Sequence, residues 1–133
     1  METVFSVEFK VRDYECDMQG IVNNTNYLHY LEHARHEYLR SVGIDFAELT
    51  EKGVFLIVNR TEIDYLTPLR SNDQFYVTCK LFRVSPLRFG FKQEIFRCAD
   101  NKKIVSANVF GTSINKQGKP FLAQEIDGLF SKQ

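Results

Sequence analysis

A carboxylate, Asp17, lies in a polar stretch that leads directly into a helical pattern. The first N–H groups of a helix have no partner within the helix, and together with the helix dipole they stabilise negative charge. Hydrolysis of an ester or thioester needs a carboxylate that attacks the carbonyl carbon or activates water, and also donors for the developing oxyanion. A carboxylate ahead of a helix N-terminus therefore indicates acyl transfer, and Gly20 gives the intervening loop the freedom to fold back.

Other interpretations of the same stretch are simpler. Asp17 is also the type of residue that caps a turn or a helix. Cys16 is its neighbour, but no histidine is placed to activate a thiol there. No Gly-x-Ser-x-Gly sequence occurs, so a serine hydrolase mechanism has no nucleophile. Asp17 is thus the candidate catalytic residue.

Three histidines, His29, His33 and His36, have the spacing of one helical face, which raises the question of a metal site. At about 100° per residue they fall opposite the apolar stripe of the helix, on the face expected to be solvated. No H-E-x-x-H motif is present. We therefore expect no metal site, and no motif in the chain indicates a cofactor.

The elements that hold Asp17 follow from the hydrophobic pattern. Residues 4–11 alternate between apolar and polar positions, as in a half-buried strand. Residues 24–42 have the period of an amphipathic helix. Its apolar stripe comprises Tyr27, Leu31, Ala34, Tyr38 and Val42, widened by Leu28 and Leu39. The candidate caps are Asn24, Thr25 and Asn26 at the start and Gly43 at the end.

Four strand-like runs follow a short connection over residues 44–53. Turn residues separate them, and the last two runs resemble antiparallel neighbours. The runs cover residues 54–65, 74–84, 88–97 and 104–114, and the tail predicts one or two helical turns over residues 123–130.

This layout predicts an α+β fold in which a five-stranded antiparallel sheet wraps around one long central helix. The chain of 133 residues has the size of one domain, so we expect a single domain over residues 1–133. One face and the edges of such a sheet stay open unless a second copy covers them, which predicts a dimer.

The composition narrows the function classes. Seventeen basic residues balance 17 acidic ones, so we expect no nucleic acid partner. Hydrophobic residues make up 44% of the chain and none form a secretory segment, so we expect no membrane association. The three cysteines, Cys16, Cys79 and Cys98, are widely spaced and odd in number, which predicts reduced thiols in a cytoplasmic protein.

Residues 17–35 resemble the signature of hotdog-fold acyl-CoA thioesterases, the 4-hydroxybenzoyl-CoA thioesterase-like family. The shared pattern is D-x-x-G-x-V, then N-Y, then E-x-A-R, in register. Residues 62–73 resemble the second strand of that family and the turn after it. The resemblance covers nearly the whole chain. It implies a hotdog fold and the hydrolysis of an aliphatic or aromatic acyl-CoA thioester to free acid and CoA.

The resemblance also implies roles for residues. The position of Asp17 holds the catalytic carboxylate, which acts as nucleophile or general base, and the backbone N–H at Asn24 polarises the thioester carbonyl. The implied substrate-binding positions are Gly20, Ile21, Val22 and Tyr27, of which Tyr27 has core packing as its simpler role. Many bacterial members carry His where this chain has Asn24. Asn does not titrate near neutral pH, so only hydrogen bonding remains at that position.

The carrier and the acyl group are left open by these residues. The run Val22-Asn23-Asn24 also resembles the acyl-ACP thioesterase branch, so acyl-ACP is an alternative substrate. Glu32 and Arg35 have the spacing of a helical ion pair, with positioning of the loop or substrate as the alternative. Candidates for an apolar acyl pocket are Phe55, Phe75, Phe89 and Phe91. Candidates for binding CoA phosphates are Arg60, Arg70, Arg83, Arg88 and Lys119.

Two further function classes compete with hydrolysis. A dehydratase of the same fold needs a histidine paired with an acidic residue, and no histidine lies near Asp17 in the sequence. A non-catalytic acyl-binding homodimer is the other class. The resemblance implies a homodimer with active sites at the shared interface, or a homotetramer made of two such dimers.

Overall fold

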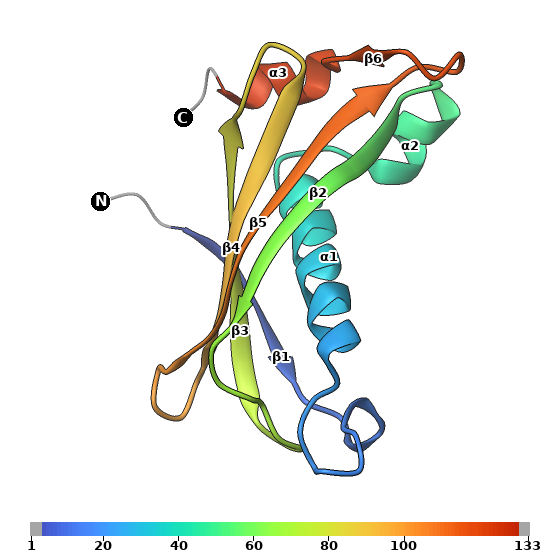
Figure 1. Ribbon diagram of the computed structural model, residues 1–133. Coiled ribbons are helices and arrows are strands. Elements are labelled where there is room, and N and C mark those ends of the chain that lie inside the picture. The colour runs from blue at the N-terminus through green and yellow to red at the C-terminus, as the bar shows by residue number, and fades with distance from the viewer. Residues whose placement is uncertain (1–3, 131–133) are drawn as a thin grey trace.

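The computed structural model describes residues 4–130. It contains an antiparallel sheet in the order β1-β3-β4-β5-β2, with a short strand β6 paired to β5. The strands are β1 Phe5–Lys10, β2 Phe55–Tyr65, β3 Gln74–Arg83, β4 Arg88–Arg97, β5 Lys103–Ile114 and β6 Pro120–Phe121. The helices are a 3-10 turn at Asp13–Glu15, α1 Asn24–Ser41, α2 Phe46–Glu51 and α3 Gln124–Phe130. Helix α1 lies along one face of the curved sheet (Figure 1), which confirms the predicted α+β hotdog architecture.

The long strands begin and end within one residue of their predicted bounds, and β4 and β5 are antiparallel neighbours as expected. The connection predicted over residues 44–53 is wrong in part, because it contains α2. The side chain of Asp45 caps this helix by accepting hydrogen bonds from Ala47 N at 2.8 Å and Glu48 N at 3.4 Å. Six residues are too few to show a helical period, so the pattern alone misses α2.

Helix α1 starts and stops through local backbone chemistry. Asn23, and none of the three predicted candidates, is the N-cap, and its Oδ1 accepts from Thr25 N at 3.1 Å. Gly43 ends the helix as predicted, with a φ of +86°. The face packed on the sheet contains Tyr27, Tyr30, Leu31, Ala34 and Leu39. Leu28 and Val42, which were assigned to this face, are exposed, since Val42 follows the last helical residue and Leu28 lies on the helix flank.

The core is divided into two clusters along α1. The first joins the N-terminal half of α1 to β1 and β3, and the second joins its C-terminal half to α2 and α3. Phe75 is fully buried in the first cluster, where its ring stacks on Phe9 at 5.1 Å and contacts Tyr30 at 4.7 Å. Phe75 is therefore a core residue. Within residues 4–130, no helix is both long enough and apolar enough to cross a membrane.

Candidate active site

Asp17 lies in a tight turn that returns the chain towards α1. Its backbone N–H donates to the carbonyl of Ile21 at 2.9 Å, and the N–H of Gly20 donates to the carbonyl of Asp17 at 3.0 Å. Gly20 has a φ of +80°, a conformation that residues with a Cβ rarely adopt. The exposed carboxylate accepts one hydrogen bond, from Gln19 N at 2.9 Å. We term residues 16–22 the Asp17 loop.

The loop runs into an N-terminus of α1 that offers a free donor. The side chain of Asn23 accepts hydrogen bonds from Thr25 N at 3.1 Å and Thr25 Oγ1 at 3.0 Å. Asn24 is the first residue of the helix, and its N–H has no hydrogen-bond acceptor among residues 4–130. Asn24 is an exposed residue, as a backbone N–H that receives a carbonyl oxygen from a substrate requires.

The Asp17 loop is fixed to the segment that follows β2. Val22 N donates to the carbonyl of Leu69 at 2.9 Å, and an isolated bridge pairs Ile21 with Arg70. A second bridge pairs Cys16 with Val22. Val22 is buried and Ile21 is half-buried, while Gly20 is exposed. The backbone of the loop is therefore held on two sides, and its tip faces solvent.

The Asn-Tyr pair of the sequence motif also holds this region together. Asn26 Nδ2 donates to the carbonyl of Glu15 at 2.8 Å, and Asn23 N donates to the same oxygen at 3.1 Å. Tyr27 is 3% exposed, and its hydroxyl accepts from Leu69 N at 3.0 Å. Burial raises the pKa of the Tyr27 hydroxyl, so it stays protonated. Tyr27 thus holds Leu69, the residue whose carbonyl accepts a hydrogen bond from Val22 of the Asp17 loop. A contact between Tyr27 and substrate stays a prediction.

We expect Tyr27→Phe to lower the free energy of unfolding by about 1–3 kcal/mol, because it leaves the buried Leu69 N–H without its acceptor. Urea unfolding followed by circular dichroism measures this change. Tyr76→Phe is the matched control, since the Tyr76 hydroxyl donates to Asn101 in an exposed pair and its loss should change stability little. Equal stability of both variants would show that the Tyr27 hydroxyl does not support the loop.

Cys16 is half-buried beside Asp17, and its pKa is raised by burial and by the nearby carboxylates of Asp13 and Asp17. A raised pKa means less thiolate at neutral pH, so this thiol is a poor nucleophile.

We expect Cys16→Ser to keep the wild-type turnover number. We also expect Cys16 to be alkylated by iodoacetamide more slowly at neutral pH than a free peptide thiol, as followed by peptide mass spectrometry. Rapid alkylation together with an inactive serine variant would contradict this assignment.

The three histidines are not grouped around a common point. His29 and His33 are exposed, whereas His36 is half-buried against the ring of Phe46 at 4.7 Å. Burial lowers the pKa of His36, so the face expected to be solvated is solvated only in part. No group of three or more metal-ligating side chains occurs within the described part of the chain.

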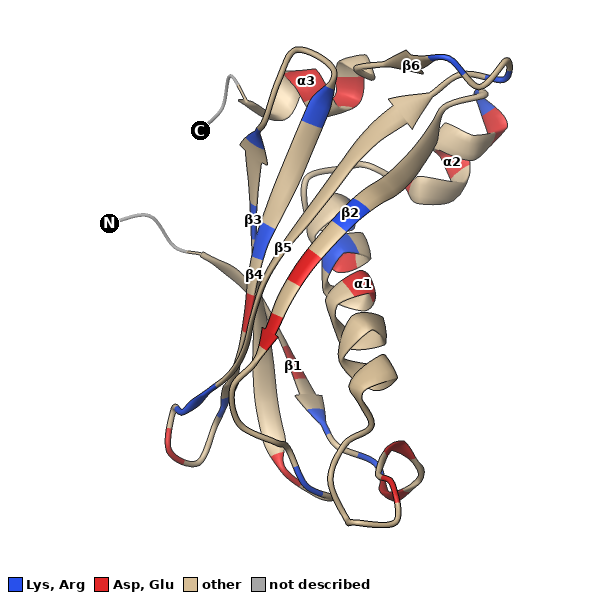
Figure 2. Cartoon of the chain, viewed as in Figure 1, with Lys and Arg blue, Asp and Glu red and all other residues tan. Residues whose placement is uncertain are grey.

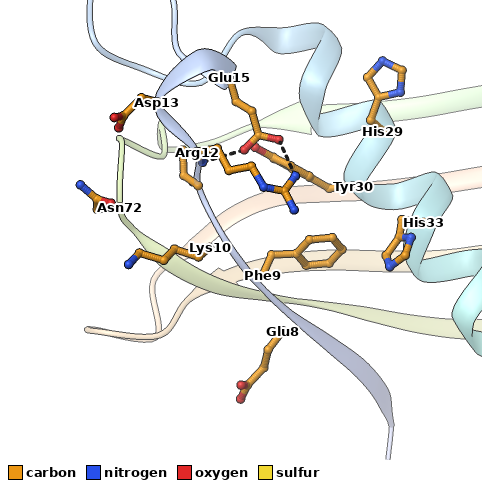
Figure 3. Close-up of a pocket in the computed structure, with 11 residues that line it drawn as sticks. Glu8, Phe9, Lys10, Arg12, Asp13, Glu15, His29, Tyr30, His33 and Asn72 are labelled. Atoms are coloured by element: carbon orange, nitrogen blue, oxygen red, sulfur yellow. Dashed lines mark hydrogen bonds and ion pairs between the residues drawn. The ribbon is translucent and has the colours of Figure 1, made fainter.

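A cavity of about 740 Å³ lies between β1 and α1 (Figure 3). Glu15 reaches it from the turn before the Asp17 loop, and accepts a hydrogen bond from Arg12 N at 2.8 Å. The buried hydroxyl of Tyr30 lies near this carboxylate, and burial followed by the neighbouring Glu15 raises the pKa of Tyr30. Charged residues of both signs line the cavity, which makes it unsuited to a hydrocarbon chain.

A second, mostly apolar pocket of about 250 Å³ lies between α1, α2, β2 and β4. Two of the four phenylalanine candidates for an acyl pocket, Phe89 and Phe91, line it, while Phe55 and Phe75 are not part of its lining. Its apolar walls also include Leu39, Phe46, Leu56, Ile57 and Val58. Arg35 lines the same pocket, and its guanidinium donates to Gln93 Oε1 at 3.1 Å. The ion pair expected between Arg35 and Glu32 is not formed.

The basic residues considered for CoA phosphates lie on different elements. Arg60 pairs with Glu62 at 3.0 Å, and Arg83 pairs with Asp127. Arg70 lies in the segment bridged to the Asp17 loop, and it is exposed. Figure 2 shows basic and acidic residues interspersed along β2 and α1. Arg70 is therefore the candidate cation nearest in connectivity to the loop.

Comparisons with known proteins identify the family of the chain. A sequence model of the thioesterase-like superfamily matches residues 11–126. A chloroplastic acyl-acyl carrier protein thioesterase of Arabidopsis thaliana is 36% identical over 120 residues, or 90% of this chain and 63% of that protein. An acyl-CoA thioesterase of Haemophilus influenzae is 30% identical over 98 residues, or 73% of this chain and 72% of that protein.

A solved structure supports the fold independently. The crystal structure of a 1,4-dihydroxy-2-naphthoyl-CoA thioesterase from Synechocystis matches with a TM-score of 0.88 at 20% identity, covering 95% of this chain and 93% of that one. At this identity the likeness shows the fold. This chain spans 63% and 56% of the lengths of two Arabidopsis relatives. Because the family match covers most of the chain, and the Haemophilus relative is matched over more than two-thirds of its length, the chain belongs to the thioesterase-like superfamily.

Proposed function

We propose that this chain hydrolyses an acyl-CoA thioester, with Asp17 as the reactive carboxylate and the N–H of Asn24 as the oxyanion donor. The observation that supports this most is the turn that folds Asp17 back against Ile21, just ahead of the unpaired N–H at the start of α1. A carboxylate and a preorganised donor are the two groups that acyl transfer needs. Membership of the thioesterase-like superfamily agrees with this chemistry.

The carboxylate has two routes to product. In the first, a carboxylate oxygen of Asp17 attacks the thioester carbon, the C–S bond breaks, and the departing thiolate takes a proton from water. The resulting mixed anhydride is then hydrolysed by a second water molecule. In the second route, Asp17 accepts a proton from the water that attacks the thioester directly. In both, the N–H of Asn24 stabilises the oxyanion, and the Asn24 side chain transfers no proton.

Acyl-ACP is the alternative substrate, and the Arabidopsis relative that carries this name favours it. Both carriers present the acyl group on a phosphopantetheine arm, so a cation near the Asp17 loop would serve either. We propose Arg70 for this role, because its backbone is bridged to Ile21 of the Asp17 loop and the residue is exposed. We expect Arg70→Ala to raise KM for the preferred carrier while leaving kcat nearly unchanged, since the side chain contacts the carrier and not the reacting carbonyl.

The experiment that tests the function follows thiol release from matched acyl-CoA and acyl-ACP substrates of several chain types. Turnover on either carrier supports thioester hydrolysis, and the ratio of kcat/KM between the carriers identifies the substrate. Tight binding of an acyl thioester without release of thiol would instead identify a non-catalytic acyl-binding protein.

We also propose that the active form is a homodimer joined along β2. This strand lies at the edge of the sheet and is mostly exposed on both faces. Its exposed residues include Ile57, Val58 and Tyr65, and Leu28 is exposed on α1. The unpaired backbone N–H and C=O groups of an edge strand are a template for pairing with a second copy. Antiparallel pairing of two β2 strands would continue the sheet across both chains.

Such a dimer would bring the Asp17 loop of one copy to the apolar pocket of the other. The loop lies at the Tyr65 end of β2, because the ring of Tyr27 contacts that of Tyr65 at 5.7 Å. The pocket lies at the opposite end, where Leu56 and Val58 line it. Antiparallel pairing about the middle of β2 places opposite ends side by side. Each site would then combine two chains.

The remaining predictions about assembly and setting belong to the same proposal. A homotetramer formed by two dimers is the second assembly to test, and light scattering distinguishes it from a dimer of 15.5 kDa chains.

All three cysteines are free thiols, which supports a reducing compartment such as the cytoplasm. We propose that residues 1–133 act as a single domain.

A further inference from the structure

Arg35 lies on the wall of a mostly apolar pocket, whose other polar lining residues are Glu32 and His36. It projects from the middle of α1 towards walls formed by Leu39, Phe46 and Phe89, among others. Burial lowers the pKa of its guanidinium. Removing a charge from water is costly unless partners compensate for it, so an arginine at this position requires an explanation.

The partners of Arg35 within the chain are few. A guanidinium carries five N–H donors and no acceptor. Among residues 4–130, Arg35 donates one hydrogen bond, from Nη1 to Gln93 Oε1 at 3.1 Å, and it forms no ion pair with a carboxylate. Glu32, which lines the same pocket, is exposed and contributes only a longer-range attraction. Most donors of Arg35 are thus unused.

Gln93 fixes the orientation of this guanidinium. It is fully buried, and its Nε2 donates to the carbonyl of Leu31 at 2.9 Å. With its amide nitrogen engaged by the helix backbone, its oxygen is directed to Arg35. A buried glutamine that connects α1 to β4 and positions a cation is a preorganised arrangement, as in ligand sites with few polar groups on apolar walls.

The size of the pocket indicates which part of a substrate it accepts. Its volume of about 250 Å³ is below the roughly 300–1,000 Å³ of pockets that enclose a whole drug-sized ligand. It therefore suits the acyl portion of a thioester and excludes the nucleotide. An acyl group in this pocket contacts apolar walls and the guanidinium N–H groups of Arg35. An oxygen atom on the acyl group could accept hydrogen bonds from these N–H groups.

We propose that this pocket receives the acyl group, and that Arg35 selects acyl groups carrying an oxygen acceptor, namely an oxo, hydroxyl or carboxylate oxygen, over plain hydrocarbon chains. The inference rests on the proposed thioester hydrolysis. Arg35 is a specificity-determining residue in this account. It binds the acyl group, whereas Asp17 and Asn24 act at the thioester carbonyl.

The test compares kcat/KM for hexanoyl-CoA with its β-oxo and β-hydroxy analogues and with the ω-carboxylate adipoyl-CoA. We expect the wild-type protein to prefer at least one oxygenated analogue by about tenfold to a hundredfold, the range for one hydrogen bond to a charged group. Arg35→Met should bring the ratio of kcat/KM between the oxygenated analogues and hexanoyl-CoA close to one, while Arg35→Lys should restore part of the preference. Arg40→Met is the matched control, because Arg40 is an exposed arginine of α1 that pairs with Glu37.

The outcomes separate the inference from the function on which it rests. Equal kcat/KM for all four substrates in the wild-type protein would overturn the role of Arg35 and leave thioester hydrolysis standing. If Arg35→Met keeps the wild-type preference among the substrates but changes the oligomeric mass, the guanidinium contacts a second copy of the chain. That result would also overturn the role of Arg35 in substrate selection. Absence of thiol release from every substrate would refute the proposed function itself. If Arg35→Met does not fold, the preferences of the wild-type and Arg35→Lys proteins decide.

Discussion

Asp17→Asn is expected to lower kcat for thioester hydrolysis by about 10⁴-fold to 10⁶-fold, the range of losses when one member of a catalytic group is removed. Asn has nearly the shape of Asp but neither attacks a thioester nor accepts a proton from water at neutral pH. Both proposed routes therefore fail in this variant. Thiol release under saturating substrate measures the loss, and KM should change little because the neighbouring binding groups remain.

The structure gives this variant a clear control. The Asn side chain keeps an oxygen that accepts the hydrogen bond from Gln19 N, and position 17 is exposed, so the fold should be retained. Asp100→Asn removes a different carboxylate, one that pairs with Arg97 in the turn between β4 and β5 and has a pKa lowered to about 2 by that hydrogen bond. This control should keep the wild-type kcat. Wild-type turnover in Asp17→Asn would show that another group carries the chemistry.

Val58→Lys is expected to dissociate the dimer and, with it, the active site. Val58 is 51% exposed on the edge strand β2, and it also lines the apolar pocket. Placing a charge in a buried interface without a partner costs about 3–5 kcal/mol, which weakens association by a factor of about 10²–10³. Light scattering over a dilution series should show mass falling towards 15.5 kDa at concentrations where the wild type stays assembled.

Activity provides the second measurement on the same variant. If each site combines the Asp17 loop of one chain with the pocket of another, kcat/KM should fall in parallel with the fraction of dimer. Val4→Lys is the control, since Val4 is 48% exposed just before β1, which forms the opposite edge of the sheet from β2. A Val58→Lys protein that is monomeric and fully active would place the whole site within one chain.

Much of the fold was predictable because its signals are local. Alternation defines the long strands, and the helical period defines α1, since a side chain's face depends only on its position along one element. The errors arise where an element is too short to show a period, or where adjacent residues are equally suited to one role. Helix α2 has six residues, and Asn23 competes for the cap with three similar neighbours. The choice of Asn23 depends on its backbone conformation, which the sequence pattern does not specify.

The candidate site likewise combines residues that the sequence could indicate with a contact that it could not. Asp17 and Asn24 are seven positions apart in one continuous motif, so residue type, order and the family resemblance could propose roles for both. The contact between Arg35 and Gln93 joins residues 58 positions apart, and spacing along α1 favoured Glu32 as the partner instead. Gln93 occupies a strand position with no distinguishing neighbour, so no local signal could have found it.

The most direct test of the account is the stoichiometry of thiol and free acid formed by the wild-type protein from an acyl-CoA or acyl-ACP substrate. If Asp17 and the N–H of Asn24 carry out hydrolysis, thiol and acid appear in equal amounts over many turnovers, and Asp17→Asn binds the same substrate without forming either. Binding of the substrate by the wild-type protein with no thiol or acid formed on either carrier would contradict the account.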